Sequence, residues 1–218
     1  MIGQLRPSRD SFYTFIFSGV RKFDILLLGE GRSDVEVVKG VIRKLGLSTD
    51  KTLAVTDCEG INKLYDMAVI ITALIKFFRR VKVLALIIDA NELGIRGRLE
   101  SLVDSISARG YTLKDRHELA PQVFMLRLKD VGIPIYVAVN GVEEYNFRKH
   151  ELEDHILKLL ELKGDVERDE FAHVGTAKEY LSSKSYDIIE VVRNSSREEV
   201  VKALNHITTL LNHLVRDP

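Results

Sequence analysis

One short stretch near the N-terminus constrains the fold more than any other part of this sequence. Residues 23–34 read Phe-Asp-Ile-Leu-Leu-Leu-Gly-Glu-Gly-Arg-Ser-Asp, an apolar run that passes through Gly-Glu-Gly directly into a helical pattern. The run predicts a buried strand, so Glu30 stands at its carboxyl end. Ligands and metals of open parallel α/β sheets gather outside the carboxyl ends of the strands. Glu30 is therefore the first candidate for a functional residue.

The turn around Glu30 and the helix after it carry further signals. Gly29 and Gly31 flank the glutamate, and glycine tolerates a positive φ and a close ligand. Ser33 and Glu36 form the pattern of a capping box, which predicts where the helix begins. Apolar residues then recur at helical spacing up to Gly46, at Val38, Val41, Ile42 and Leu45, which predicts one buried helix face.

A second apolar run brings another carboxylate to the same edge. Residues 83–88 are continuously apolar and are followed by Asp89, as expected of a strand buried on both faces. We expect further strands at residues 53–56, 123–126 and 135–139, and helices near residues 62–79, 96–109, 151–163 and 200–214. Alternating strands and helices indicate an α/β fold with a doubly wound, mainly parallel sheet.

Two motifs at these strand ends resemble those of the Toprim domain family. Glu30, Gly31 and Asp34 match its Glu-Gly-x-x-Asp motif, and Asp89 and Gly94 match its Asp-x-Asp-x-x-Gly motif. Small stand-alone archaeal Toprim-like proteins are the most similar in character. The resemblance covers about residues 23–150 and implies a Toprim-like α/β domain there. Residues 1–22 are then an N-terminal arm or edge strand, and residues 151–218 a helical C-terminal extension packed on the same domain.

The resemblance also implies a Mg²⁺ or Mn²⁺ site. It makes Asp89 a metal ligand and Glu30 a ligand or proton carrier, both catalytic. Asn91 occupies the position of the family's second aspartate, and its amide oxygen brings no charge. Glu92, Asp57 or Glu59 could supply the missing charge, and Asp154 or Glu153 could supply a late ligand. Around these ligands we expect a supporting group formed by Asp34, Gly29, Gly31 and Gly94.

The charge balance limits how the chain could bind a polyanion. Lys and Arg number 32, as do Asp and Glu, so nucleic-acid binding requires cations that are segregated near the carboxylates. Arg32, Arg96 and Arg98 are the candidates. For the last two, a surface ion pair with Glu92 or Glu100 is the alternative.

The N-terminal region allows two interpretations. Cations at residues 6–9 and 21–22 flank aromatic residues at positions 12–17, a pattern that can stack on bases and contact phosphates. A β-prone edge strand is the stronger interpretation. This strand or the last helix could also mediate a homodimer.

Composition indicates a reducing cytoplasm. The single cysteine, Cys58, excludes an internal disulfide, and the apolar runs are shorter than the roughly 20 residues of a membrane span. Only two glutamines accompany many charged residues, which leans toward a thermophile.

Two functions remain open from the sequence. The first is a Mg²⁺- or Mn²⁺-dependent nuclease, a hydrolase acting on phosphodiester bonds of DNA or RNA. The alternative is a non-catalytic Toprim-like module that binds nucleic acid or protein and has a degraded metal site.

Overall fold

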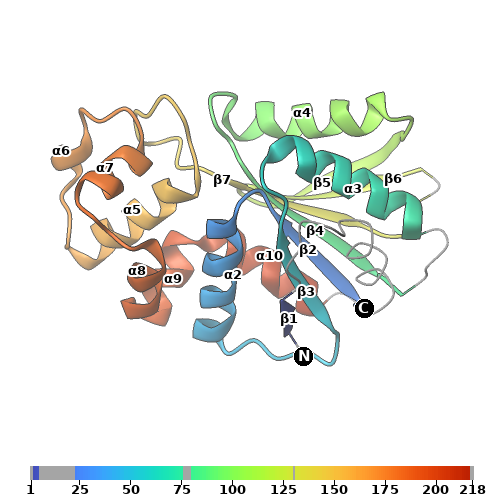
Figure 1. Cartoon of the computed structure of the whole chain (residues 1–218), viewed down its shortest axis with the longest axis horizontal. Coiled ribbons are helices and arrows are strands. Elements are labelled where there is room, and N and C mark those ends of the chain that lie inside the picture. Colours follow the sequence, from blue (N-terminus) through green and yellow to red (C-terminus); the bar gives the residue numbers. More distant parts are fainter. Residues whose placement is uncertain (1, 5–22, 76–79, 130, 217–218) are drawn as a thin grey trace.

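A computed structural model describes residues 2–4, 23–75, 80–129 and 131–216. In this part of the chain the strands form a seven-stranded sheet in the order β1-β3-β2-β4-β7-β6-β5 (Figure 1). The first five strands in this order run parallel, while β6 is antiparallel to β7 and to β5. The α/β class and the mainly parallel sheet predicted from the sequence are confirmed.

The elements have the following bounds. The strands are β1 Ile2–Gln4, β2 Ile25–Gly29, β3 Leu53–Asp57, β4 Val83–Asp89, β5 Leu113–Ala120, β6 Val123–Leu128 and β7 Ile135–Asn140. The helices are α2 Arg32–Leu45, α3 Ile61–Ile75, α4 Gly94–Ala108, α5 Leu152–Lys163, α6 Arg168–Phe171, α7 Ala177–Ser183, α8 Ile188–Asn194, α9 Arg197–Ala203 and α10 Asn205–Arg216.

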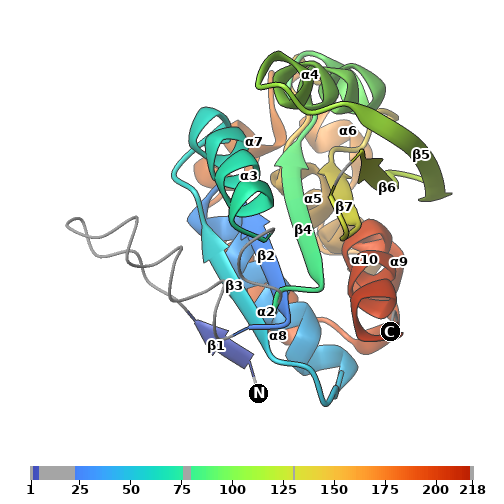
Figure 2. The same cartoon turned by 90° about the vertical axis from the view of Figure 1, so that its right-hand side faces the viewer.

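Helices cover both faces of the sheet. On β2, Ile25 and Leu27 belong to a core shared with α2 and the C-terminal helices, whereas Leu26 and Leu28 belong to a core shared with α3 and α4. Successive side chains of a strand point to opposite faces, so a continuous apolar run is needed when both faces are buried. Figures 1 and 2 show α3 and α4 on one face and α2 with α10 on the other.

The C-terminal helices belong to this same core. Leu210, Leu211 and Leu214 of α10 are at most 1% exposed and lie in the core that contains residues of α2. Thr176 and Ser196 cap α7 and α9, since each hydroxyl accepts the backbone N–H three residues later. The prediction of one helix over residues 200–214 was wrong. α9 and α10 are separate helices divided at Leu204, whose ψ of 38° leaves the helical range.

The start of α2 and the strand β5 also differ from what the sequence predicts. α2 begins at Arg32, with Gly31 as its N-cap, and the carboxylate of Asp34 accepts the Gly31 N–H at 2.8 Å. The Ser33 and Glu36 capping box is therefore wrong; Glu36 bonds Lys39 instead. β5 was not anticipated, because its polar sequence gives only half-buried and exposed positions.

Of the N-terminal arm or edge strand predicted for residues 1–22, the structure describes residues 2–4. β1, at residues 2–4, forms the edge of the sheet and runs parallel to β3. The aromatic run at residues 12–17 and the end of the helix expected over residues 62–79 lie outside the described residues. None of the described helices has the length and apolar character needed to cross a membrane.

Candidate functional site

The site lies where the direction of winding reverses. From β2 the chain passes through α2 to β3 on one side of β2. β4 lies on the other side of β2, and its next neighbour in the sheet is β7. Such a reversal opens a crevice at the carboxyl ends of the two central strands. Gly29 pairs with Ile87 in the register of β2 and β4, so Glu30 lies beside the end of β4. The Asp89 N–H donates to Glu30 Oε2 at 3.2 Å.

Asn140, at the end of β7, joins two of the carboxylates. Its Nδ2 donates to Asp34 Oδ1 and to Asp89 Oδ1, both at 2.9 Å. Asp89 pairs with Asn140 in the sheet register, which explains why a residue 51 positions away reaches it. Asp89 Oδ1 also accepts the N–H of Leu152, at the start of α5, at 3.1 Å. Both side chains are thus held in fixed orientations.

A histidine from the last helix completes this network. Carboxylates accept both amide hydrogens of Asn140, so its Oδ1 is an acceptor, and it lies 2.8 Å from Nε2 of His206. His206 therefore carries its proton on Nε2. Its ring stacks on His155 with centroids 4.0 Å apart. Burial, followed by repulsion from His155, places the pKa of His206 well below its usual range.

His155 is neutral for a related reason. Its Nε2 accepts the Gly141 N–H at 2.9 Å, and its Nδ1 donates to the Ala203 carbonyl at 2.9 Å. Burial lowers the pKa of His155 to about 4. The pair of histidines thus links β7, α5 and the end of α9 without adding charge to the site.

Burial and mutual repulsion perturb the acids of the crevice. Burial raises the pKa of Asp34 to about 7, and repulsion from Glu30 and Glu153 adds to this effect. Burial also raises the pKa of Asp89 well above its usual value, with further contributions from Asp34 and Glu30. Burial is likewise the main cause of the raised pKa of Glu30 and of Glu153. Perturbed acids that gather in one crevice are typical of functional sites.

Of the two glycines beside Glu30, Gly29 serves close packing. A Cβ on Gly29 would lie 2.8 Å from Cβ of Asp34, so only glycine lets α2 approach the end of β2 this closely. Gly31 has φ −133° and ψ 174°, an extended conformation open to any residue. The turn at Gly31 therefore makes no use of the positive φ that glycine tolerates.

The other predicted ligands have surroundings of their own. Glu59 is exposed and pairs with Lys63 at 2.7 Å, and Glu92 pairs with Lys149 at 2.9 Å. Asp57 ends β3 opposite Gly29 and is half-buried. Asn91 has φ 50° and exchanges two backbone hydrogen bonds with His150. The Asn91 Nδ2 lies 3.5 Å from the Asp89 carbonyl.

Asp154 and Glu153 have different surroundings. Asp154 is 1% exposed, and its Oδ2 accepts from the Val142 N–H at 3.0 Å and bonds His150 Nδ1 at 2.8 Å. Its Oδ1 is buried without a hydrogen-bond partner in the described part of the chain. Glu153, in contrast, raises the pKa of both Asp34 and Asp89. Glu153 thus lies near the crevice carboxylates, whereas Asp154 is hydrogen-bonded to the Val142 N–H and to His150.

The predicted arginines fall into two groups. Arg32 and Arg96 are exposed at the starts of α2 and α4. Arg98 is 8% exposed, and its Nε donates to the Asp89 carbonyl at 2.7 Å. The start of α4 is capped by Glu143, whose Oε1 accepts the Ile95 N–H at 2.9 Å. Gly94, with φ 70°, has no room for a Cβ, which would lie 2.9 Å from the same oxygen.

Sequence reasoning did not identify Asn140, His155 and His206 as site residues. Asn140 was noted only as the residue that ends a strand, and the strand register alone places it against Asp89. No signal in the sequence connects His206 to a residue 66 positions earlier. No group of three or more His, Cys, Asp or Glu side chains with metal-ligand geometry occurs among the residues that the structure describes.

Residues 24–166 match the family described as "Protein of unknown function (DUF3226)". The chain belongs to this family. The matched region contains every carboxylate of the crevice as well as Asn140, whereas His206 lies beyond it. A search of curated proteins found no match. Among solved structures, the chain is similar to the C-terminal region of the Xanthomonas campestris pv. campestris OLD protein, with 16% identity, coverage of 88% of this chain and 98% of that chain, and a TM-score of 0.39.

Proposed function

We propose that this DUF3226 protein is a hydrolase that cleaves phosphodiester bonds of DNA or RNA with the help of Mg²⁺ or Mn²⁺. The observation that carries the proposal is the group of carboxylates at the switch point of the sheet, where Glu30, Asp34 and Asp89 have raised pKa values. The two motifs that resemble the Toprim family meet at this same crevice.

The residues present suit a hard divalent cation. Burial and mutual repulsion of Asp34, Asp89 and Glu30 make their ionised forms unfavourable, and a bound cation would relieve this. Glu30 and Asp89 offer carboxylate oxygens, and Mg²⁺ needs only one or two carboxylates because it keeps several waters. When bound, such an ion would neutralise charge on the phosphate and lower the pKa of a bound water.

The side chains have distinct roles in this proposal. Glu30 is half-buried, and burial raises its pKa, which suits a group that takes up and releases a proton during catalysis. Asp89 is held by Asn140 and the Leu152 N–H, so it presents a fixed ligand. Arg98 holds the Asp89 carbonyl and is positioned to orient the end of β4 rather than the substrate.

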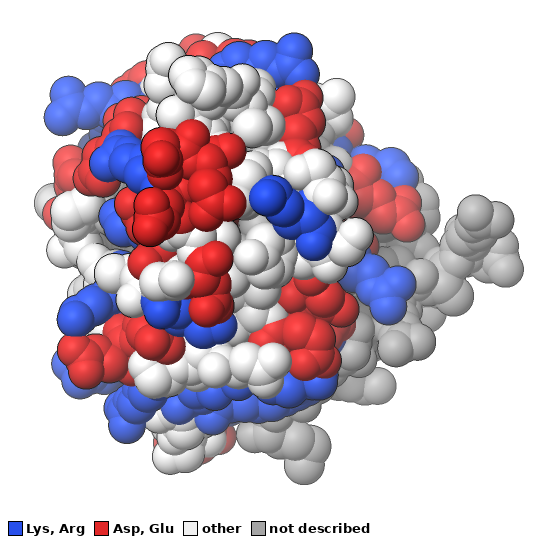
Figure 3. All heavy atoms as spheres, turned by 90° about the vertical axis from the view of Figure 1, so that its left-hand side faces the viewer, with Lys and Arg blue, Asp and Glu red and all other residues white. Residues whose placement is uncertain are grey.

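Substrate phosphates would contact Arg32 and Arg96. Both are exposed at helix starts that follow the two motif strands. Local cations are required because the net charge is zero, and Figure 3 shows acidic and basic side chains interspersed over the end of the molecule formed by the C-terminal helices. A neutral protein can hold a polyanion only through such a local group.

Cleavage assays with the purified chain test the proposal. We expect Mn²⁺-dependent cleavage in a panel of labelled single- and double-stranded DNA and RNA, and loss of cleavage in Asp89→Asn. Glu92→Gln is the matched control, because Glu92 is exposed and pairs with Lys149, and it should cleave like the wild type. Calorimetry should show Mn²⁺ binding that Asp89→Asn weakens. Absence of Mn²⁺ binding by the wild type would overturn the metal-dependent function.

A non-catalytic nucleic-acid-binding module is the second candidate. It is favoured by Asn91, whose neutral amide replaces the second aspartate and lies toward the Asp89 carbonyl. Fluorescence anisotropy would then report oligonucleotide binding without cleavage. Asn91→Asp separates the two candidates further, since aspartate also tolerates the positive φ at this position. Tighter Mn²⁺ binding in this variant would place residue 91 at the metal.

A further inference from the structure

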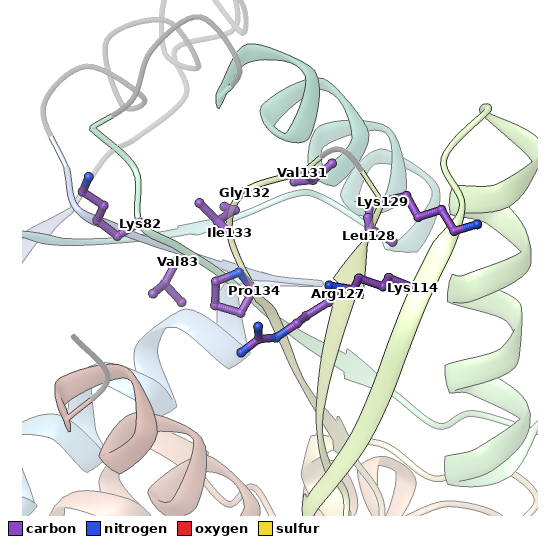
Figure 4. Close-up of a pocket in the computed structure, with 10 residues that line it drawn as sticks. All are labelled: Lys82, Val83, Lys114, Arg127, Leu128, Lys129, Val131, Gly132, Ile133 and Pro134. Atoms are coloured by element: carbon purple, nitrogen blue, oxygen red, sulfur yellow. The ribbon is translucent and has the colours of Figure 1, made fainter.

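A cavity of about 580 Å³ lies at the opposite end of the sheet from the carboxylates. Its walls come from the start of β4, the end of β6 and the loop that leads into β7 (Figure 4). Val83, the first residue of β4, lines it, whereas Asp89 ends the same strand. At about 3.3 Å per residue, six steps along a strand separate the two regions by roughly 20 Å. The cavity is thus a separate site.

Every charged side chain that lines this cavity in the described part of the chain is a cation. These side chains are Lys82, Lys114, Arg127 and Lys129. None of the four forms an ion pair within the described residues, although lysines and arginines elsewhere, such as Lys149 and Arg148, pair with acids. All four are exposed. Within the described residues, a chain with zero net charge thus places four cations without an ion pair around one cavity.

The fold aims two of these cations at the cavity. Arg127 lies on β6 opposite Asp115 of β5, and the register shifts between Leu113 and Asp115. Such a bulge redirects a side chain out of the regular alternation, and Lys114 is the residue at the shift. Figure 4 shows the Arg127 guanidinium reaching toward Pro134, with Lys114 beside it and Lys82 and Lys129 at the two ends of the cavity.

The rest of the wall is apolar. Val83, Ile133 and Pro134 line the cavity between the cations. At Gly132, an added Cβ would meet no atom within 4 Å, so the loop leaves open space there. The volume lies in the range of about 300–1,000 Å³ that is usual for small-molecule sites. The guanidinium fork of arginine matches phosphate oxygens in pairs, and apolar surface suits a flat base.

We propose that this cavity binds a phosphate-bearing ligand of nucleotide size, either a free nucleotide or a nucleotide unit of a nucleic-acid strand. The cations hold the phosphate, and the apolar wall contacts the base. This proposal does not depend on the function assigned to the carboxylate crevice.

Binding measurements on the full chain test it. Adenosine triphosphate, inorganic pyrophosphate and a short single-stranded oligonucleotide are titrated in buffer with EDTA, which removes divalent cations from the carboxylate crevice. We expect the triphosphate or the oligonucleotide to bind, and Lys114→Gln/Arg127→Gln to weaken that binding at least tenfold. Arg197→Gln/Lys202→Gln on α9 is the matched control, because it removes the same charge from exposed positions. Circular dichroism confirms that both double variants remain folded.

Each outcome decides the proposal. Binding of the nucleotide that is lost in the cavity variant and kept in the control supports a free-nucleotide site, and the same pattern for the oligonucleotide alone supports a strand site. Binding of pyrophosphate as tightly as the nucleotide would overturn the assigned role of the apolar wall. No binding of any probe, or equal weakening by both double variants, would overturn the site.

Discussion

At the scale of single residues, Asn140 allows the carboxylates of Asp34 and Asp89 to lie in the same crevice. Its Nδ2 donates 2.9 Å hydrogen bonds to both Asp34 and Asp89, and its Oδ1 faces His206. Because an amide is neutral, it can stand between two acids without adding charge, and each of its polar atoms has a partner. Among the described residues, Nδ1 of His206 has no hydrogen-bond partner, so the network is satisfied at Asn140 itself.

Asn140→Ala should therefore destabilise the fold. Asp34, Asp89 and His206 would each lose a hydrogen-bond partner, and an unsatisfied buried polar group costs about 1–3 kcal/mol. We expect the free energy of unfolding to fall by roughly 3 kcal/mol, measured by urea denaturation. Asn194→Ala, at an exposed position in the last turn of α8, is the control and should stay within about 0.5 kcal/mol of the wild type. An equal effect of the two substitutions would contradict the role of Asn140.

Asp34 predicts a pH dependence of stability. Its pKa is about 7 in the folded protein, against an ordinary value of 3.8, mainly because of burial. Between these values the folded state retains a proton that the unfolded state has lost, so this group reduces stability as pH rises from about 4 to 7. Asp34→Asn removes the titration. The free energy of unfolding of Asp34→Asn relative to the wild type should rise across this window and then level off.

Urea denaturation at several pH values between 4 and 8 measures that difference. Comparing the variant with the wild type at each pH cancels the contributions of the buried histidines, which titrate in both proteins. Any hydrogen bond lost through the substitution shifts the curve but does not change its slope. A difference that stays constant from pH 4 to 7 would show that Asp34 titrates at its ordinary value.

At the level of elements, the contact of α2 with α8 connects the motif helix to the C-terminal region. A Cβ on Gly40 of α2 would lie 3.1 Å from Cγ1 of Val192, which is 1% exposed. Lys44 of α2 also donates to the Arg193 carbonyl at 2.7 Å. Glycine at this position therefore permits a close helix packing that a larger residue would disturb.

Gly40→Ala should accordingly destabilise the protein, although alanine usually favours a helix interior by about 1 kcal/mol over glycine. Valine has one preferred rotamer in a helix and cannot move aside easily, so we expect a net loss of about 1 kcal/mol from overpacking. In a Val192→Ala background the same change should stabilise by about 0.5–1 kcal/mol. Thermal or urea denaturation of the wild type, the two single variants and the double variant completes a double-mutant cycle. A stabilising effect in both backgrounds would contradict the packing argument.

The elements also show what sequence can and cannot predict. β2 and β4 are buried on both faces and read as continuous apolar runs, so their positions and the carboxylates at their ends could be predicted. β5 is polar and pairs by register with β6 alone, which leaves no apolar pattern to detect. The break at Leu204 interrupts neither the apolar periodicity nor the helix-forming residues around it. The contacts of Asn140 and His206 arise from tertiary packing between distant segments.

At the scale of the whole molecule, the C-terminal helices hold residues of the crevice in place. The family match ends at residue 166, yet His206 of α10 bonds Asn140 and the Ala203 carbonyl accepts from His155. Apolar residues of α8, α9 and α10, and Leu204 between the last two helices, also fill the core over α2 and the sheet. Among them are Val191, Val192, Val200, Leu204, Ile207, Leu210, Leu211 and Leu214.

A chain that ends at residue 166 should therefore fail to fold, although it contains the whole family match and every carboxylate of the crevice. Burying one Val, Leu or Ile side chain contributes about 1.5–3 kcal/mol, so these eight side chains contribute roughly 12 kcal/mol even at the low end, comparable to the 5–15 kcal/mol net stability of a typical domain. We expect no cooperative urea transition, strong binding of a hydrophobic dye and no Mn²⁺ binding. A chain ending at residue 216 is the control and should behave like the full chain. A cooperative transition in the shorter chain would show that the sheet with α2, α3, α4 and α5 is stable alone, and that the C-terminal helices only tune the site.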